Sequence, residues 1–185
     1  TLVYSATSCT FDQIKTSGKI SVKGETAGIG GIVNVNDGNA VIKNCVNAIN
    51  ITVDVRGTAD SSPSCDIGGI TIFASGSSSK SLLQNCTNKG TIKVTYKPSD
   101  EWGGNEFSIS GVANSFYGKK AVKNCKNTGA IICTIEKAAE GFATEANIAG
   151  VIGMSNSGID SCSNTGKITL NANVSNMTGI DVAGV

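Results

Sequence analysis

Short stretches in which apolar and polar residues alternate recur along the chain. In residues 90–96, Ile92, Val94 and Tyr96 occupy every second position, and this period of two predicts a half-buried β-strand. Residues 107–114 and 121–125 predict two further strands, separated by segments rich in Gly, Asn, Ser and Asp. This part of the chain is therefore predicted to hold three short strands.

Two short motifs indicate that this arrangement repeats. The first is Asn-Cys-x-Asn at residues 44–47, 85–88 and 124–127, with Ser-Cys-Ser-Asn at 161–164. The second places a glycine between apolar residues, at 29–32, 67–70, 109–112, 148–151 and 182–185. Successive cysteines of the first motif lie 41, 39 and 37 residues apart. Both motifs thus recur independently with a period of about 40 residues, which is typical of a repeat protein.

We predict an all-β fold, a parallel β-helix (β-solenoid) with about 40 residues and three short strands per coil, in which stacked coils supply the core. Propeller blades have a similar period of about 40–45 residues, but four and a half blades would not close a ring. The chain is expected to form a single domain over residues 1–185. We expect an irregular start at 1–15, repeats at about 16–47, 48–88, 89–127 and 128–164, and a partial repeat at 165–185.

Composition supports the strand prediction and excludes several functions. The chain has 20 Ile and 15 Val but only 4 Leu, and β-branched side chains favour strands over helices. There is no His, so no imidazole can serve as a general base or metal ligand. With 15 basic and 14 acidic residues, the chain lacks the basic excess of a nucleic-acid binder. No apolar run reaches the roughly 18 residues of a transmembrane segment.

Four of the seven cysteines share one phase of the repeat and are predicted to stack as a ladder of buried thiols that act as small hydrophobes. They are Cys45, Cys86, Cys125 and Cys162. Cys65 and Cys133 lie outside this ladder and are the better candidates for any disulfide. Because there is no Cys-x-x-Cys pair and no His, we expect no metal site on the cysteines.

The asparagines form two further columns. One column holds Asn44, Asn85 and Asn124, and the other holds Asn47, Asn88, Asn127 and Asn164. Asn tolerates the left-handed backbone that tight corners need, and stacked amides can bond to one another. A structural role at the corners is favoured over ligand binding.

Each repeat inserts a stretch of different length at one phase, and such insertions map to one edge of a solenoid, often the binding edge. These stretches hold nine of the 14 acidic residues, while the opposite connections are mainly basic. The candidate binding residues are Trp102, Asp100, Glu101, Glu106, Glu136 and Glu140. Such an acidic edge would suit a cation such as Ca²⁺, a glycan or a basic protein patch. No other cofactor is expected, and ordinary solvated loops are the alternative. Asn173 and Asn176, each in an Asn-x-Ser/Thr pattern, are candidate glycosylation sites.

The motifs resemble the GLUG-type repeats of bacterial cell-surface and secreted proteins, in which a Gly-Gly-Leu-Val-Gly segment leads into an Asn-Cys-x-x-x-Gly turn. The residues that carry the resemblance are 30–33 with 44–45, and 149–153 with Cys162 and Gly166. Ile or Val stands where the family prefers Leu. The resemblance implies an adhesin-like or stalk role at the cell surface. The peptidase activity of some proteins with such repeats does not carry over, because no His-Glu-x-x-His is present.

The chain is therefore expected to be a non-catalytic surface or extracellular repeat protein with a structural or adhesive role. Its expected partners are a protein or glycan at a cell surface, or further copies that associate end to end through uncapped solenoid ends. One alternative is a glycan- or protein-binding module of a larger secreted protein. Another is a carbohydrate-active β-helix enzyme, with Asp100, Glu101 and Glu106 facing Glu136 or Glu140 as paired carboxylates.

Overall fold

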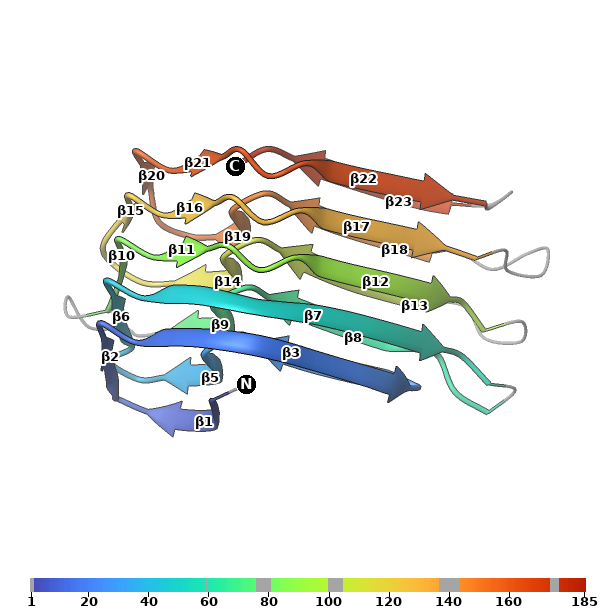
Figure 1. Ribbon diagram of the computed structural model, residues 1–185, viewed down its shortest axis with the longest axis horizontal. Helices are drawn as coiled ribbons and strands as arrows, with labels where there is room; N and C mark the ends of the chain where they lie inside the picture. The colour runs from blue at the N-terminus through green and yellow to red at the C-terminus, as the bar shows by residue number, and fades with distance from the viewer. Residues whose placement is uncertain (1, 59, 76–80, 100–104, 137–143, 174–176) are drawn as a thin grey trace.

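The computed structural model describes residues 2–58, 60–75, 81–99, 105–136, 144–173 and 177–185. Within these residues every regular element is a strand, and all pairs between strands of successive coils are parallel (Figure 1). The chain winds upward from the N-terminus, so that each coil lies on the one before it. The predicted all-β parallel solenoid is confirmed.

The strands form four sheets that run along the stack. Sheet A contains β1 (Val3–Thr7), β5 (Val33–Asp37), β9 (Thr71–Ser75), β14 (Ala113–Tyr117) and β19 (Ile152–Ser155). Sheet B contains β2 (Thr10–Asp12), β6 (Val41–Lys43), β10 (Leu82–Gln84), β15 (Val122–Lys123) and β20 (Ile159–Asp160).

Sheet C is the largest sheet and lies opposite sheet D. Sheet C contains β3 (Lys15–Gly24), β7 (Val46–Arg56), β11 (Thr87–Asn88), β12 (Ile92–Lys97), β16 (Lys126–Asn127), β17 (Ile131–Ile135), β21 (Ser163–Asn164) and β22 (Ile168–Ala172). Sheet D contains β4 (Thr26–Gly30), β8 (Ser64–Gly68), β13 (Asn105–Ser110), β18 (Thr144–Ala149) and β23 (Met177–Ala183).

The register of sheet C follows the period of the sequence. Asn47 pairs with Thr16 on one side and Asn88 on the other, and Asn127 pairs with Asn88 and Asn164. These residues end the predicted repeats, so each predicted repeat is one coil of the solenoid.

Strands occur at all three places predicted for each repeat, but each coil contributes strands to four sheets, so the predicted number of three strands per coil is too low. The segment predicted at 107–114 is divided at Gly111 into β13 and β14, which belong to different sheets. A strand of two residues, such as β11 or β16, follows each of the ladder residues Cys86 and Cys125. In the second coil this short strand is continuous with the long one, which gives β7 its 11 residues.

The start of the chain was predicted to be irregular over residues 1–15, and this is wrong for most of it. Strands β1 and β2 pair in register with β5 and β6 of the next coil. Asp12 pairs with Lys43, so Gln13 takes the corner position of Asn44, and both residues have positive φ values of 58° and 56°. This first coil lacks the Asn-Cys motif. It keeps the backbone shape and the inward apolar side chains of the later coils, because parallel pairing requires both.

Two apolar clusters fill the solenoid. One lies between sheets C and D and contains the inward columns of Ile51, Ile92 and Ile131. At the loop edge of this cluster, the rings of Tyr96 and Phe107 lie 4.6 Å apart, and the Tyr96 hydroxyl donates to the Pro63 carbonyl at 2.9 Å. The other cluster lies between sheets A, B and the short strands of sheet C, and holds Ile42, Leu83 and Phe116. The predicted core of Ile and Val is thus observed on both sides of the coil.

Candidate binding face

The inner asparagine column predicted from the sequence is a buried hydrogen-bonded ladder. The Nδ2 atoms of Asn47, Asn88 and Asn127 each donate to the Oδ1 of the next asparagine at 2.8 Å, ending at Asn164. The Asn88 and Asn127 Nδ2 atoms also donate to the carbonyls of Gly90 and Gly129. Because Asn47, Asn88 and Asn127 have no exposed surface, this column holds coils together and offers nothing to a ligand.

The cysteine column is also structural. Cys45, Cys86 and Cys125 are fully buried, Cys162 is half-buried, and all seven cysteines are free thiols. Cys65 and Cys133, the predicted candidates for a disulfide, lie as free thiols in the core between sheets C and D. Burial raises the pKa of Cys133 to about 12, so this thiol stays protonated at neutral pH.

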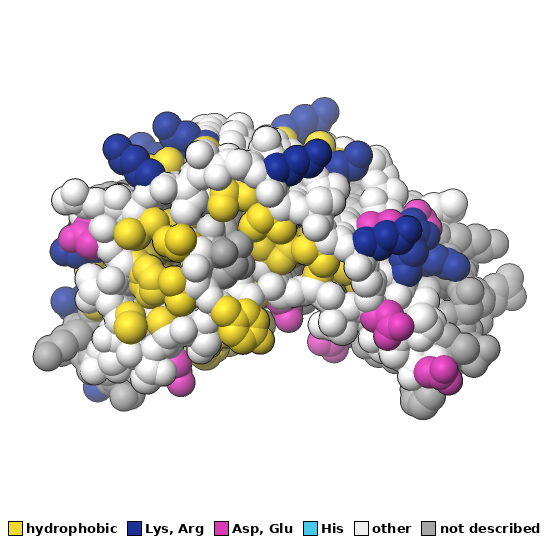
Figure 2. All heavy atoms as spheres, turned by 60° about the horizontal axis from the view of Figure 1, so that its bottom comes forward, with side chains coloured by type: hydrophobic (Ala, Val, Ile, Leu, Met, Phe, Trp, Pro, Cys, Tyr) yellow, Lys and Arg dark blue, Asp and Glu magenta, His cyan; other side chains and the backbone are white. Residues whose placement is uncertain are grey.

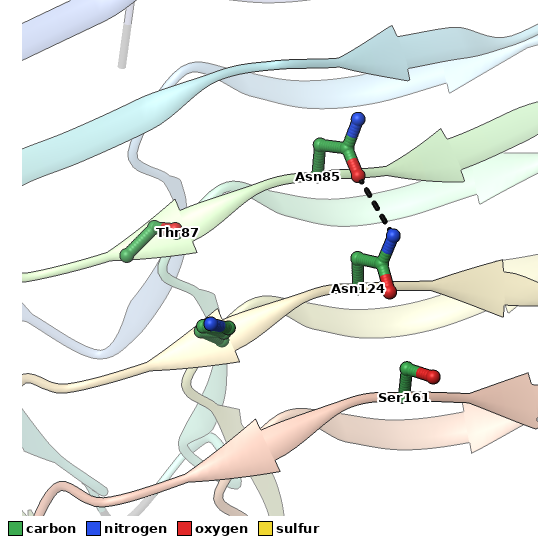
Figure 3. Close-up of a pocket in the computed structure, with 5 residues that line it drawn as sticks. Asn85, Thr87, Asn124 and Ser161 are labelled. Atoms are coloured by element: carbon green, nitrogen blue, oxygen red, sulfur yellow. Dashed lines mark hydrogen bonds between the residues drawn. The ribbon is translucent and has the colours of Figure 1, made fainter.

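The outer asparagine column stands on the surface at the corner between sheets B and C. Asn44, Asn85 and Asn124 have φ values of 56°, 52° and 52°, the left-handed conformation expected there. Asn124 donates to Asn85 at 3.1 Å (Figure 3), and Asn85 donates to Asn44 at 3.0 Å. Asn85 and Asn124 border an open cavity of about 530 Å³ that is also lined by Thr87, Lys126 and Ser161. The corner is therefore both a structural feature and an ordered polar surface.

Two of the candidate residues at the loop edge are described, and the structure gives them different partners. Glu136, directly after β17 of sheet C, accepts two hydrogen bonds from the Arg56 guanidinium at 2.9 and 3.1 Å. Glu106, in β13 of sheet D, is exposed and pairs in register with Ser64 and Glu145. The described structure does not bring these two carboxylates together. Asp100, Glu101, Trp102 and Glu140 lie outside the described residues, so the site predicted at this edge stays a prediction.

The strands of sheet D reach closer to this edge than the sequence indicated. The predicted variable stretches included Asp66, Glu106 and Glu145, but all three residues lie in strands. Each alternates with an inward apolar neighbour, namely Cys65, Phe107 and Ala146. The three carboxylates are therefore held on a rigid sheet and point to its outer side.

The outer sides of sheets D and A meet at an angle and enclose a shallow groove. The Asn114 amide of sheet A donates to Asp66 of sheet D at 3.1 Å. A Cβ on Gly28 of sheet D would stand 3.4 Å from the Cδ1 of Ile72 in sheet A. Such contacts between outer faces require the two sheets to bend toward each other. We call the outer surface of sheets A and D the concave face; its hollow is visible on the lower margin of Figure 2.

The described strands of the concave face carry acidic residues and no basic ones. The strands of sheets A and D contain no Lys or Arg, and their acidic residues are Asp37, Asp66, Glu106, Glu145 and Asp181. Burial is the main cause that raises the pKa of Asp66, and the nearby Glu106 carboxylate adds to the effect. Asp66 and Glu106 line a small cavity of about 110 Å³ with Ser64, Phe107, Ser108 and Asn147.

Apolar side chains occupy the sheet A half of the concave face. The rings of Phe73 and Tyr117 lie 5.7 Å apart, and the Tyr117 hydroxyl donates to the sulfur of Met154 at 2.8 Å. Met154 is 54% exposed. At the bend between the two halves, the Ser110 hydroxyl is fully buried and has no hydrogen-bond partner within the described part of the chain. The face thus combines an aromatic and thioether strip with a row of carboxylates.

The outer surface of sheet C, which we call the convex face, carries the opposite charge. Seven exposed lysines stand on its strands or between them: Lys15, Lys19, Lys23, Lys89, Lys93, Lys126 and Lys167. The one acidic residue in these strands is Asp54, which pairs with Arg56 at 2.8 Å. Lysines stand along the arched upper margin of Figure 2, above the carboxylates of the hollow. The sequence indicated two oppositely charged edges, whereas in the described structure the division follows the two faces.

The remaining predictions concern glycosylation sites, a metal site and membrane-spanning segments. Asn173 is exposed directly after β22, and Asn176 lies outside the described residues. No group of three or more Cys, Asp or Glu that could hold a metal ion occurs among the described residues, and the carboxylates predicted for Ca²⁺ are mostly not among them. No described segment forms a helix able to cross a membrane.

Comparison of the chain with family models, curated proteins and solved structures finds no match in any of the three. The resemblance to GLUG-type repeats therefore rests on the motifs alone and stays a prediction.

Proposed function

We propose that the chain is a non-catalytic structural or adhesive repeat protein of the cell surface or extracellular space, and that its concave face binds a positively charged protein. The observation that carries this proposal is the complete segregation of Lys and Arg from the strands of sheets A and D. The location follows from the motif resemblance. A stack of coils held by buried amides is a rigid support for such a face.

The carboxylates of the concave face are available to a partner. In the described structure no Lys or Arg forms an ion pair with Glu106, Glu145 or Asp181, whereas Asp12, Asp54 and Asp160 of the other sheets are paired. Uncompensated charge of one sign on a hollowed surface attracts ligands of the opposite charge and speeds their association. The aromatic and thioether strip supplies the apolar contact area that protein interfaces favour.

A binding measurement with a cationic probe tests the proposal. Fluorescence anisotropy of labelled poly-lysine should show binding at low salt that weakens at about 0.5 M NaCl, because screening then acts within a few ångströms. The double variant Glu106→Gln/Glu145→Gln should bind about tenfold more weakly. The control Asp12→Asn/Asp160→Asn removes the same charge from sheet B and should bind as the unmodified protein does. Equal weakening in both variants, or no binding at all, would contradict the proposal.

The outer asparagine corner favours a second candidate, a glycan-binding module. Amides in line with the hydroxyls of Thr87 and Ser161 and the ammonium of Lys126 suit the hydroxyls of a sugar chain. A glycan array tests it with Asn124→Gly, since glycine accepts the positive φ of this corner. Retained binding by this variant would remove the candidate.

A further inference from the structure

We infer that the positively charged partner is a second copy of this chain, whose convex face seats in the concave face of the first. This inference rests on the proposed function and names the partner of the same face. The two faces lie on opposite sides of one coil, so each molecule offers both.

Charge complementarity supports this partner. The convex face presents seven exposed lysines, and its only acidic strand residue is already paired with Arg56. The concave face presents carboxylates without any basic strand residue. Two copies that meet through like faces would bring like charges together. Only the contact between unlike faces joins lysines to carboxylates.

Shape and spacing support it as well. Sheet C forms the arched side of the molecule, and the bend between sheets D and A forms the hollow (Figure 2). The charges on both faces stand on strands that are stacked about 4.8 Å apart. Glu106 and Glu145 are neighbours on adjacent coils, while Lys19 and Lys93 lie on coils separated by one. Both separations are whole numbers of coil steps, so a copy with a parallel coil axis places its lysines on the same levels as the carboxylates that it meets.

An association of two different surfaces on opposite sides does not close on itself. A pair of bound copies keeps one free acidic face and one free basic face, and further copies add side by side. The expected product is an open lateral array whose size grows with protein concentration. Added salt should dissolve it, because the charges are on the surface.

Sedimentation velocity with two neutralised variants tests the inference. At low salt the unmodified protein should show a sedimentation coefficient that rises with concentration, and at about 0.5 M NaCl it should be monomeric. Glu106→Gln/Glu145→Gln loses the concave contact and Lys19→Gln/Lys93→Gln the convex one, so each alone should remain monomeric. Their equimolar mixture keeps one intact pair of faces and should form dimers that do not grow further.

Control variants and alternative outcomes make the result decisive. Asp12→Asn/Asp160→Asn and Lys43→Gln/Lys123→Gln neutralise sheet B and should associate as the unmodified protein does, and thermal unfolding should show that every variant is folded at the temperature of the measurement. Association that survives in both face variants would place the contact elsewhere, such as the coil ends, and overturn the inference. A monomer at low salt that still binds poly-lysine would overturn the inference and leave the proposed function standing. Failure to bind poly-lysine as well would overturn both.

Discussion

Gly111 packs directly against the side chain of Asn127: a Cβ on Gly111 would stand 2.5 Å from the Cγ of Asn127 and closer still to the carbonyl oxygen of Gly150. The same relationship joins Gly31 to Asn47, Gly69 to Asn88 and Gly150 to Asn164, each at 2.6 Å. The two motifs of the repeat are therefore one physical unit. The glycine makes room for the amide, and the amide ties the coil to the next one.

Replacing Gly111 by Ala should destabilise the protein severely. The new methyl group meets backbone on one side and a buried amide on the other, and neither can move without breaking the ladder. We expect a loss of about 3 kcal/mol or more in the free energy of unfolding, at the upper end for overpacked sites. Urea denaturation followed by circular dichroism measures this loss.

Gly158→Ala is the matched control for this change. A Cβ at Gly158 would meet only the Cβ of Ala121, at 3.7 Å, which is an ordinary contact. Its stability should change by less than about 0.5 kcal/mol, as is usual for surface positions. Similar losses in both variants would show that the close approach at Gly111 is not the cause.

The two asparagine columns should respond differently to removal of an amide. Asn88→Ala leaves the Asn47 Nδ2 and the Asn127 Oδ1 buried without their partners, and each unsatisfied group costs about 1–3 kcal/mol. Asn85→Gly removes an exposed amide at a left-handed φ that glycine accepts, and water can replace the lost contacts. Chemical denaturation should therefore show a loss of about 2–4 kcal/mol for the first variant and under about 1 kcal/mol for the second. Equal losses in both variants would contradict the view that the buried inner column stabilises the protein more than the exposed outer column does.

The fold could be predicted from the sequence because the residues that recur with the repeat contact one another in successive coils. Asn47, Asn88 and Asn127 recur with the period of the stack, so their spacing predicts their pairing. The charged faces were harder to find, because Asp66, Glu106 and Glu145 resemble loop residues when polarity alone is considered. Their alternation with Cys65, Phe107 and Ala146 is short, and Cys and Ala are weak apolar signals. Which faces bend toward each other depends on tertiary contacts such as that between Asn114 and Asp66, and spacing along the chain does not contain them.

Thiol accessibility should divide the seven cysteines into two groups. Cys9 is exposed, and Cys162 is half-buried with a pKa lowered to about 7 by its hydrogen bond with the Cys125 thiol. The other five thiols are buried. Titration with Ellman's reagent should find two reactive thiols in the native protein and all seven in denaturant, and Cys9→Ser should lower the native count to one. Fewer than seven thiols in denaturant would reveal a disulfide, and a higher native count would argue against the buried ladder.

The carboxyl group of Asp66 should make the free energy of unfolding fall as the pH rises, which is the opposite of the usual trend for an acidic side chain. Burial raises its pKa above 3.8, so between that value and the raised one the folded state keeps a proton that the unfolded state has lost. Stability therefore falls as the pH rises through this window, and the penalty is complete above it. Asp66→Asn removes the charge but keeps an oxygen that can accept from Asn114. This variant should be more stable than the unmodified protein at pH 7 and equally stable below about pH 3.5.

Asp12 should show the opposite dependence of stability on pH. Hydrogen bonds from Asn44 and Lys43 lower its pKa, so its contribution to stability is present above 3.8 and is lost as the pH falls through the lowered value. Asp12→Asn should therefore be less stable than the unmodified protein at pH 7, and the difference should vanish in strong acid. Urea denaturation of both variants across this pH range measures the two trends together. If Asp66→Asn were destabilising at pH 7, the carboxylate would be gaining a favourable partner in the groove, and the concave face would not be the site of uncompensated negative charge that the binding proposal requires.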